Sequence, residues 1–75
     1  MRIEEQLGMR IRFLRKQKHM SIEDLAIESD INRNYLCDLE NGRRNPTVDV
    51  LEKIANALGI TLEFLFKGIV EVKGL

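Results

Sequence analysis

Histidine and cysteine are too scarce in this chain for metal or nucleophilic chemistry. Its 75 residues include one cysteine, Cys37, and one histidine, His19, which together cannot supply the four ligands of a structural zinc site. A lone cysteine also excludes an intrachain disulfide. Neither a glycine-rich phosphate loop nor a paired-carboxylate pattern is present. We therefore expect no metal, no cofactor and no enzymatic activity.

Long hydrophobic runs are also lacking. No apolar stretch approaches the roughly 20 residues that a membrane span needs, and the acidic start, MRIEE, is unlike a signal peptide. We expect a cytoplasmic protein with no membrane partner. Aromatic residues make up 5% of the chain and tryptophan is absent, so Leu, Ile and Val must build the core. A chain of this length holds one modest core, and we expect a single domain over residues 1–75.

The chain has no surplus charge of either sign, because 12 basic residues balance 12 acidic ones. Affinity that ignores DNA sequence comes from neutralised phosphates, so this balance argues mildly against a general nucleic-acid coat. The charges are unevenly distributed: residues 10–18 hold five bases and no acid, and residues 20–30 hold four acids and no base. Two solvated helix faces would give the same alternation.

The spacing of apolar residues predicts five helices. In the first, over about residues 3–18, Leu7, Ile11 and Leu14 recur on one face. Good N-capping residues precede the other four, at about residues 22–29, 33–40, 48–58 and 62–66. These caps are Ser21, Asn32, Thr47 and Thr61. We therefore predict an all-α domain.

Two segments outside these helices have a distinct composition. The loop over residues 41–46 is dense in turn-forming residues and carries Arg43 and Arg44. The tail over residues 68–75 is rich in β-branched residues and partly alternating, as a short C-terminal β-strand would be. A lone strand leaves an edge unpaired, so this tail would need a partner.

Residues 21–40 have the spacing of a helix-turn-helix. Two short helices are separated by about three residues, and the small Ala26 falls where the helices cross. Ile31 fills the turn, while Leu36 and Leu39 seat the second helix on the core. Any trio of packed helices offers something similar, so this pattern alone is moderately specific.

Several segments in a common register resemble the Cro and lambda-repressor-like helix-turn-helix family, also called the XRE type. They are LR at 14–15, SIEDLA at 21–26, YL at 35–36, LENGR at 39–43, NPT at 45–47 and LGI at 58–60. The resemblance covers roughly residues 7–66, and LENGR followed by Asn-Pro is its most specific part. It implies a five-helix lambda-repressor-like DNA-binding domain. Size and composition are similar to stand-alone repressors and restriction-modification controller proteins, and the sequence does not choose between them.

The resemblance implies that the third helix reads base edges in the major groove of double-stranded DNA. The implied base-contacting residues are Arg33, Asn34 and Asp38. Arg can donate two hydrogen bonds to guanine, Asn can pair with adenine, and Asp can accept from a cytosine amino group. As an alternative, Asp38 orients Arg33.

Contacts with the DNA backbone are implied around the same helix. The residues concerned are Asn32, Tyr35, Asn41, Arg43 and Arg44. Asn32 is first of all an N-cap, whose side chain or backbone N–H also meets a phosphate. Arg15 and Glu40 match a pair that in the family bridges the first helix to the end of the third.

The chain departs from the family pattern at three positions. Ile22 stands where the family usually has Gln, whose amide meets the DNA backbone, which leaves one phosphate contact open. Asp30 stands where a turn Gly is usual, and we expect the turn to survive because Asp tolerates a left-handed conformation. His19 replaces a Gly at the end of the first helix, which could alter that helix end or place a titratable group near the DNA.

One module of this size reads only a few base pairs, so we predict a homodimer on a palindromic operator. Its two recognition helices would lie about one DNA turn apart. The predicted dimer interface consists of Leu58, Ile60, Leu62, Phe64, Leu65, Phe66, Ile69, Val70 and Val72. Alternatively, residues 64–66 close the core of a single copy.

The predicted function is that of a sequence-specific DNA-binding transcriptional regulator, acting as a repressor, an activator or both. The alternative is a protein-interaction module, such as an antitoxin or an adaptor, that keeps the fold with little DNA reading. The zero net charge and Ile22 favour this alternative slightly.

Overall fold

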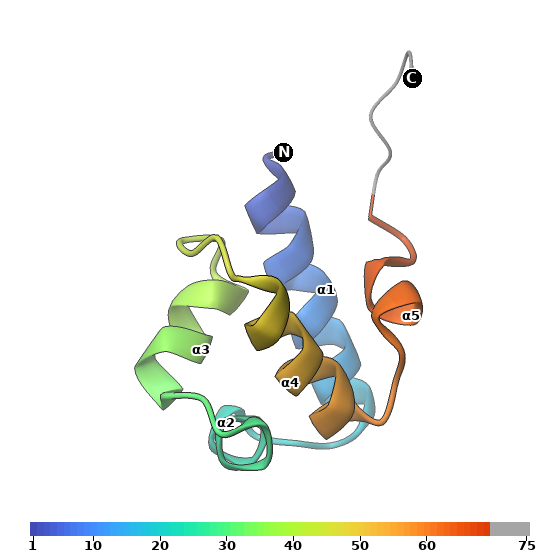
Figure 1. Cartoon of the computed structure of the whole chain (residues 1–75). Helices are drawn as coiled ribbons and strands as arrows, with labels where there is room; N and C mark the ends of the chain where they lie inside the picture. The colour runs from blue at the N-terminus through green and yellow to red at the C-terminus, as the bar shows by residue number, and fades with distance from the viewer. Residues whose placement is uncertain (70–75) are drawn as a thin grey trace.

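Five helices account for most of the chain. The computed structural model describes residues 1–69, and within them it contains these five helices and no strand. They are α1 (Ile3–Gln17), α2 (Ile22–Ser29), α3 (Arg33–Glu40), α4 (Val48–Leu58) and α5 (Leu62–Phe66) (Figure 1). The predicted all-α architecture is confirmed. The predicted tail strand, with Val70 and Val72, extends outside the described residues.

The helix starts follow the predicted caps, because each cap oxygen satisfies a backbone N–H that the helix itself leaves unpaired. The side chains of Ser21, Asn32, Thr47 and Thr61 each accept a hydrogen bond of 3.0–3.2 Å from a backbone N–H three residues along the chain. In α2 the bond is reciprocal, since the Asp24 carboxylate accepts from the Ser21 backbone at 2.9 Å. Local chemistry therefore sets these boundaries.

Two residues take up the backbone conformation that glycine would favour. His19 has a φ of 58° and Asp30 a φ of 56°, both in the left-handed region, while Gly59 at the end of α4 has a φ of 70°. The turn between α2 and α3 therefore survives with Asp30, as expected. His19 likewise leaves the end of α1 in the conformation of a glycine, at a cost in strain.

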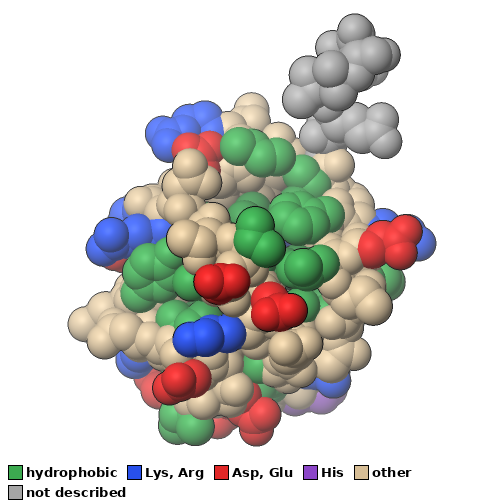
Figure 2. Space-filling model, viewed as in Figure 1, with side chains coloured by type: hydrophobic (Ala, Val, Ile, Leu, Met, Phe, Trp, Pro, Cys, Tyr) green, Lys and Arg blue, Asp and Glu red, His purple; other side chains and the backbone are tan. Residues whose placement is uncertain are grey.

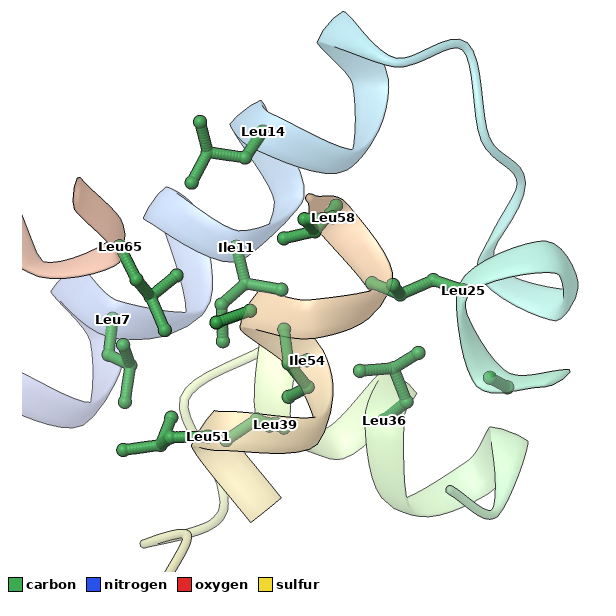
Figure 3. Packing of buried hydrophobic residues seen from close by; sticks show 12 residues of the cluster. Leu7, Ile11, Leu14, Leu25, Leu36, Leu39, Leu51, Ile54, Leu58 and Leu65 are labelled. Atoms are coloured by element: carbon green, nitrogen blue, oxygen red, sulfur yellow. The ribbon is translucent and has the colours of Figure 1, made fainter. Parts of the chain in front are cut away.

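The core is formed where α1 and α4 meet the other three helices. α1 contacts α3 and α5, α4 contacts α2 and α5, and α2 contacts α3. In Figure 1, α3 and α5 lie on opposite sides of the molecule with α1 and α4 between them. Twelve hydrophobic residues make up the buried cluster, and Ile11, Leu36 and Ile54 among them are fully buried (Figure 3). None of the helices in the described range has the length and apolar character needed to cross a membrane.

Burial corrects part of the predicted dimer interface. Leu58 and Leu65 have an exposure of 0% and pack in the same core as Ile11. Their side chains are enclosed by their own chain, so neither can contact a second copy, and their assignment to the interface is wrong.

A glycine inside α1 allows a close crossing between α1 and α3. A β-carbon at Gly8 would lie 2.5 Å from the carbonyl oxygens of both Leu39 and Glu40, in the last turn of α3. Backbone atoms cannot swing aside as a side chain can, so only glycine lets α1 lie this close to α3. Gly8 was not among the residues singled out from the sequence.

Candidate nucleic-acid interface

The helix-turn-helix is held together from its buried side. Leu36 and Leu39 of α3 are fully buried, and the half-buried Ile31 closes the turn with its backbone N–H donating to the carbonyl of Ala26 at 2.9 Å. The Ser29 hydroxyl donates to the carbonyl of Leu25 within the last turn of α2. These contacts leave the opposite, polar side of α3 facing solvent.

The residues predicted to contact bases lie on the solvent side of α3. Arg33 and Asn34 are exposed in its first turn, and Asp38 is half-buried farther along. The Arg33 Nε donates to the Glu23 carboxylate of α2 at 2.6 Å, which holds the pKa of Glu23 below its ordinary value. The alternative in which Asp38 orients Arg33 is wrong, because Glu23 occupies that role.

Asp38 instead faces the loop that follows α3. Its two carboxylate oxygens lie 3.4 Å from Arg43 Nη1 and 3.5 Å from Arg44 Nη2, and its carbonyl accepts from the Arg43 backbone at 2.9 Å. Gly42 makes the turn with a φ of 76°. Arg44 also stacks on Tyr35, with the guanidinium carbon 5.3 Å from the ring centroid. Basic side chains project on this side of the molecule, at the left edge of Figure 2.

The remaining predicted backbone-contacting residues belong to the two ends of α3. Asn32 caps the helix by accepting from the Tyr35 N–H at 3.1 Å, which confirms the predicted N-cap. At the other end, the exposed Asn41 donates from its side chain to the carbonyl of Cys37 at 2.9 Å. The structure therefore gathers all the predicted DNA-contacting residues on α3, its cap and the loop that follows.

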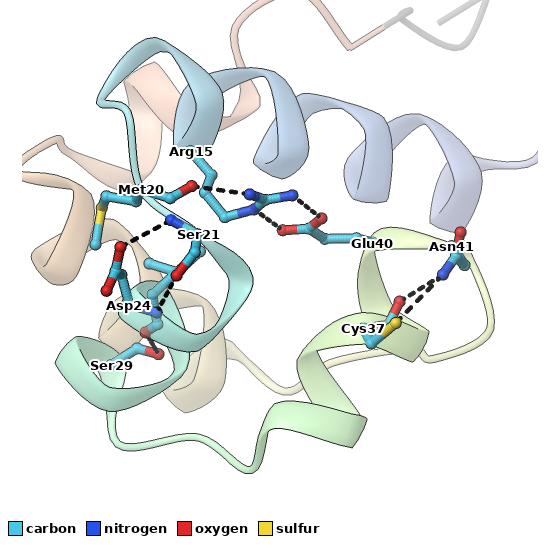
Figure 4. A network of polar contacts seen from close by, with 9 residues as sticks. Arg15, Met20, Ser21, Asp24, Ser29, Cys37, Glu40 and Asn41 are labelled. Carbon is cyan, nitrogen blue, oxygen red and sulfur yellow. Dashed lines mark hydrogen bonds and ion pairs between the residues drawn. The ribbon is translucent and has the colours of Figure 1, made fainter.

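A buried ion pair ties α1 to the end of α3, as predicted. The Nε and Nη2 atoms of Arg15 donate to the two carboxylate oxygens of Glu40 at 2.7 and 2.9 Å, and Nη1 donates to the carbonyl of Met20 at 2.9 Å (Figure 4). The hydrogen bonds to Glu40 raise the pKa of Arg15. Because Glu40 is the last residue of α3, this pair positions both the helix end and the loop after it.

An apolar surface covers α5 on the opposite side of the molecule from α3. Phe64 and Phe66 are 42% and 44% exposed, and both line a groove of about 600 Å³ together with the polar residues Thr61, Glu63 and Lys67. The other predicted interface residues in the described range, Ile60, Leu62 and Ile69, are half-buried. Figure 2 shows hydrophobic side chains gathered over the start of α4 and toward α5.

This apolar surface continues onto α1. Arg10 donates to the carbonyls of Phe64 and Leu65 at 2.8 and 3.1 Å, and its guanidinium lies 5.1 Å from the Phe64 ring centroid. On the same helix Met9 and Phe13 are 56% and 53% exposed and line a groove of about 550 Å³ together with Arg10. Sequence reasoning missed Met9 and Phe13, although their spacing of four residues would have placed them on one helix face.

No metal site is assembled in the part of the chain that the structure describes. Residues 1–69 contain no group of three or more His, Cys, Asp or Glu side chains close enough to hold an ion. Cys37 is half-buried, and its sulfur lies 3.7 Å from the side-chain nitrogen of Asn41. The arrangement around α3 is suited to hydrogen bonding with a polar, anionic surface.

Comparison with known proteins agrees with this geometry. A helix-turn-helix family model, HTH_3, matches residues 11–65. The control protein C.MunI of a Mycoplasma species is 43% identical over 68 residues, which cover 89% of this chain and 92% of that protein. C.BamHI of Bacillus amyloliquefaciens is 46% identical over 54 residues, covering 71% of this chain and 67% of the relative.

A solved structure of a controller protein has the same fold as this chain. The crystal structure of the restriction-modification controller protein C.AhdI from Aeromonas hydrophila superimposes with a TM-score of 0.82 at 38% identity, covering 84% of this chain and 96% of that one. The relatives named here are control proteins. The chain belongs to the helix-turn-helix (HTH_3) family and is a DNA-binding transcriptional regulator of the XRE class that includes these controllers.

Proposed function

We propose that this regulator binds a palindromic operator as a homodimer, with α3 of each copy in the major groove. One observation carries the proposal: α3 is fixed to the core by the fully buried Leu36 and Leu39, while Arg33 and Asn34 stay exposed at its start. A rigid helix with a polar outer face can enter a groove without rearranging.

The side chains around α3 divide into two roles by their chemistry. Arg33, Asn34 and Asp38 carry the donors and acceptors that distinguish base edges in the major groove. Residues of the cap, the helix and the loop contact phosphates and set the register, and these are Asn32, Tyr35, Asn41, Arg43 and Arg44. Side-chain exposures of 69% for Arg43 and 52% for Arg44 support this second role.

The proposed dimer interface is the apolar surface on α5 and α1. It retains Ile60, Leu62, Phe64, Phe66 and Ile69 from the sequence prediction. It gains Met9 and Phe13, since both are exposed and Arg10 links their helix to Phe64. Large exposed aromatic side chains grouped on one short helix are typical of a surface that a partner covers.

The relatives suggest the genes that are controlled. C.AhdI is named a restriction-modification controller, and C.MunI is matched over nearly its full length. We therefore propose that this chain regulates restriction and modification genes from an operator in their upstream region.

Footprinting on the upstream DNA would locate the operator, and dissociation constants for operator and scrambled duplexes would then test the roles. Arg33→Ala should remove most of the preference for the operator, except the part that Asn34 and Asp38 supply, and should leave much of the non-specific binding. Arg43→Ala should weaken binding to all duplexes alike and reduce the salt dependence by about one phosphate contact. Equal losses on both duplexes for both variants would contradict these roles. Absence of duplex binding at low salt would refute the function itself.

A further inference from the structure

An exposed ion pair joins the start of α2 to the base-reading end of α3. Glu23 is the second residue of α2 and Arg33 the first of α3, and their side chains are 56% and 51% exposed. Glu23 Oε2 lies 2.6 Å from Arg33 Nε. We propose that Glu23 is a positioning residue that presets Arg33 for one base and so increases the DNA specificity, an inference that rests on the proposed function.

Stability of the fold does not account for this pair. Ion pairs between exposed side chains contribute little to folding, because water screens them and two flexible side chains must be held still. The two helices are already joined by buried apolar contacts, with Leu25, Ala26 and Leu36 in the common core. The consequence of the pair therefore falls on the conformation of Arg33.

The atom that Glu23 binds leaves the recognition edge of Arg33 available. Among the described residues, the side chain of Arg33 is hydrogen-bonded through Nε alone. Its terminal nitrogens, Nη1 and Nη2, carry four further N–H donors at the tip of the side chain. Two of these match the O6 and N7 acceptors of guanine. Glu23 can thus remain bound while Arg33 reads a base.

Presetting Arg33 lowers the entropic loss when the operator is bound. A free arginine samples many rotamers, and ordering it at an interface opposes binding. The carboxylate of Glu23 also opposes binding to any duplex, because it repels phosphates. Presetting acts on the operator complex alone, so it raises the ratio of operator to non-specific affinity. The repulsion lowers both affinities and leaves that ratio unchanged.

The other DNA-facing arginines are held differently. Arg43 and Arg44 share the single carboxylate of Asp38 at 3.4 and 3.5 Å, whereas Arg33 has Glu23 to itself at 2.6 Å. The longer contacts with Asp38 hold the loop arginines less tightly, although Arg44 also stacks on Tyr35. Of the three arginines, Arg33 has the shortest contact with a carboxylate. A side chain that reads one base needs a fixed conformation of this kind.

The test compares the wild type with five variants by the ratio of the dissociation constants for a scrambled and an operator duplex. For Glu23→Ala we expect the ratio to fall about 3- to 10-fold, with the scrambled duplex bound as tightly as before or more tightly. Glu23→Gln keeps an oxygen that accepts from Arg33 Nε and should recover part of the ratio. Glu28→Ala, the control, removes another exposed acid of α2 that lies about 140° around the helix, and should leave the ratio unchanged.

Combining Glu23→Ala with Arg33→Ala separates positioning from a direct effect. If Glu23 acts through Arg33, the double variant has the same ratio as Arg33→Ala alone, and a further fall overturns the inference. The inference is also overturned if the wild type discriminates and Glu23→Ala has the same ratio of scrambled to operator dissociation constants as the wild type. If the wild-type protein itself does not discriminate, the proposed function fails and this inference fails with it. Thermal melts of each variant confirm that the ratio is measured on folded protein.

Discussion

Among single residues, Arg15 and Glu40 form the most deeply buried ion pair in the described part of the chain. Their side chains are 10% and 4% exposed, and all three Arg15 nitrogens are hydrogen-bonded. A buried ion pair contributes little net stability as a unit, since both charges lose their hydration. Each partner alone, however, would be a buried charge without compensation. Substituting either residue alone should therefore destabilise the fold more than replacing both together.

Glu40→Ala should lower the free energy of unfolding by about 3–5 kcal/mol, because Arg15 would keep its charge in a buried site without its partner. Urea denaturation monitored by circular dichroism measures the change. The control is the double variant Arg15→Met with Glu40→Leu, which replaces the pair by apolar side chains. If the double variant were as unstable as the single one, packing and not the stranded charge would be the cause.

His19→Gly should raise the free energy of unfolding by about 0.5–1 kcal/mol. Relief of the left-handed strain at the φ of 58° is worth roughly 1–2 kcal/mol, and the greater entropy of glycine in the unfolded chain offsets part of it. Urea denaturation of the variant gives the value. Gln17→Gly, two residues earlier in α1, is the matched control and should be destabilising. Destabilisation by His19→Gly would mean that the side chain makes a favourable contact.

At the scale of elements, local sequence chemistry explains the boundaries and the order of the helices. Ser21, Asn32, Thr47 and Thr61 bond to backbone groups three residues away, so their effect could be predicted without knowledge of the fold. The helix-turn-helix was predictable for a similar reason, since Ile31 and Leu36 lie within one short stretch. These are short-range interactions, which a sequence displays directly.

Contacts between distant elements were beyond the same reasoning. Leu65 lies in a helix of five residues, which is too short for a periodic pattern to separate its buried from its exposed side. Glu23 meets Arg33 only after the turn has set the angle between α2 and α3. Gly8 fits against α3 across more than thirty residues of sequence, and a single glycine carries no sign of what approaches it.

Gly8→Ala should destabilise the protein by about 1–3 kcal/mol, as overpacking in a close helix crossing does. The added methyl group meets two backbone oxygens, so α3 must move away from α1. Operator affinity should fall as well, because the recognition helix shifts with respect to the rest of the molecule. Thermal unfolding and duplex binding measure the two effects. Lys16→Ala, at an exposed site on α1, is the control and should change stability by less than about 0.5 kcal/mol. A wild-type melt for Gly8→Ala would show that the crossing is looser than the structure has it.

At the scale of the whole molecule, two surfaces on opposite sides have different tasks. The side of α3 is polar, and Arg33, Arg43 and Arg44 there each lie beside a carboxylate. The side of α5 is apolar and carries the exposed Phe64 and Phe66. This separation lets one surface bind DNA while the other meets a second copy, as the proposed function requires.

Phe64→Ser should shift the protein toward the monomer, because a large aromatic side chain leaves the centre of the proposed dimer surface. Sedimentation velocity over a range of protein concentrations measures the shift. Binding to a palindromic duplex should weaken more than binding to a half-site, since only the former needs two copies. Ile27→Ser removes a hydrophobic side chain that is 79% exposed on α2, outside this surface, and serves as the control in sedimentation. Equal dimer populations for the two variants would place the interface elsewhere.

The carboxylates beside the DNA-facing arginines have a consequence for how such a regulator responds to its own abundance. Glu23 and Asp38 neutralise part of the charge of these arginines, so we expect random DNA to bind the protein weakly and to retain few molecules. The concentration of free regulator then follows the amount synthesised, because few molecules are bound at non-specific sites on the chromosome. Because the proposed function requires two copies to associate before an operator is occupied, occupancy should rise more steeply than the amount of protein. Under the proposed function, this local pairing of charges, in a chain of zero net charge, makes operator occupancy depend steeply on the amount of regulator that has been synthesised.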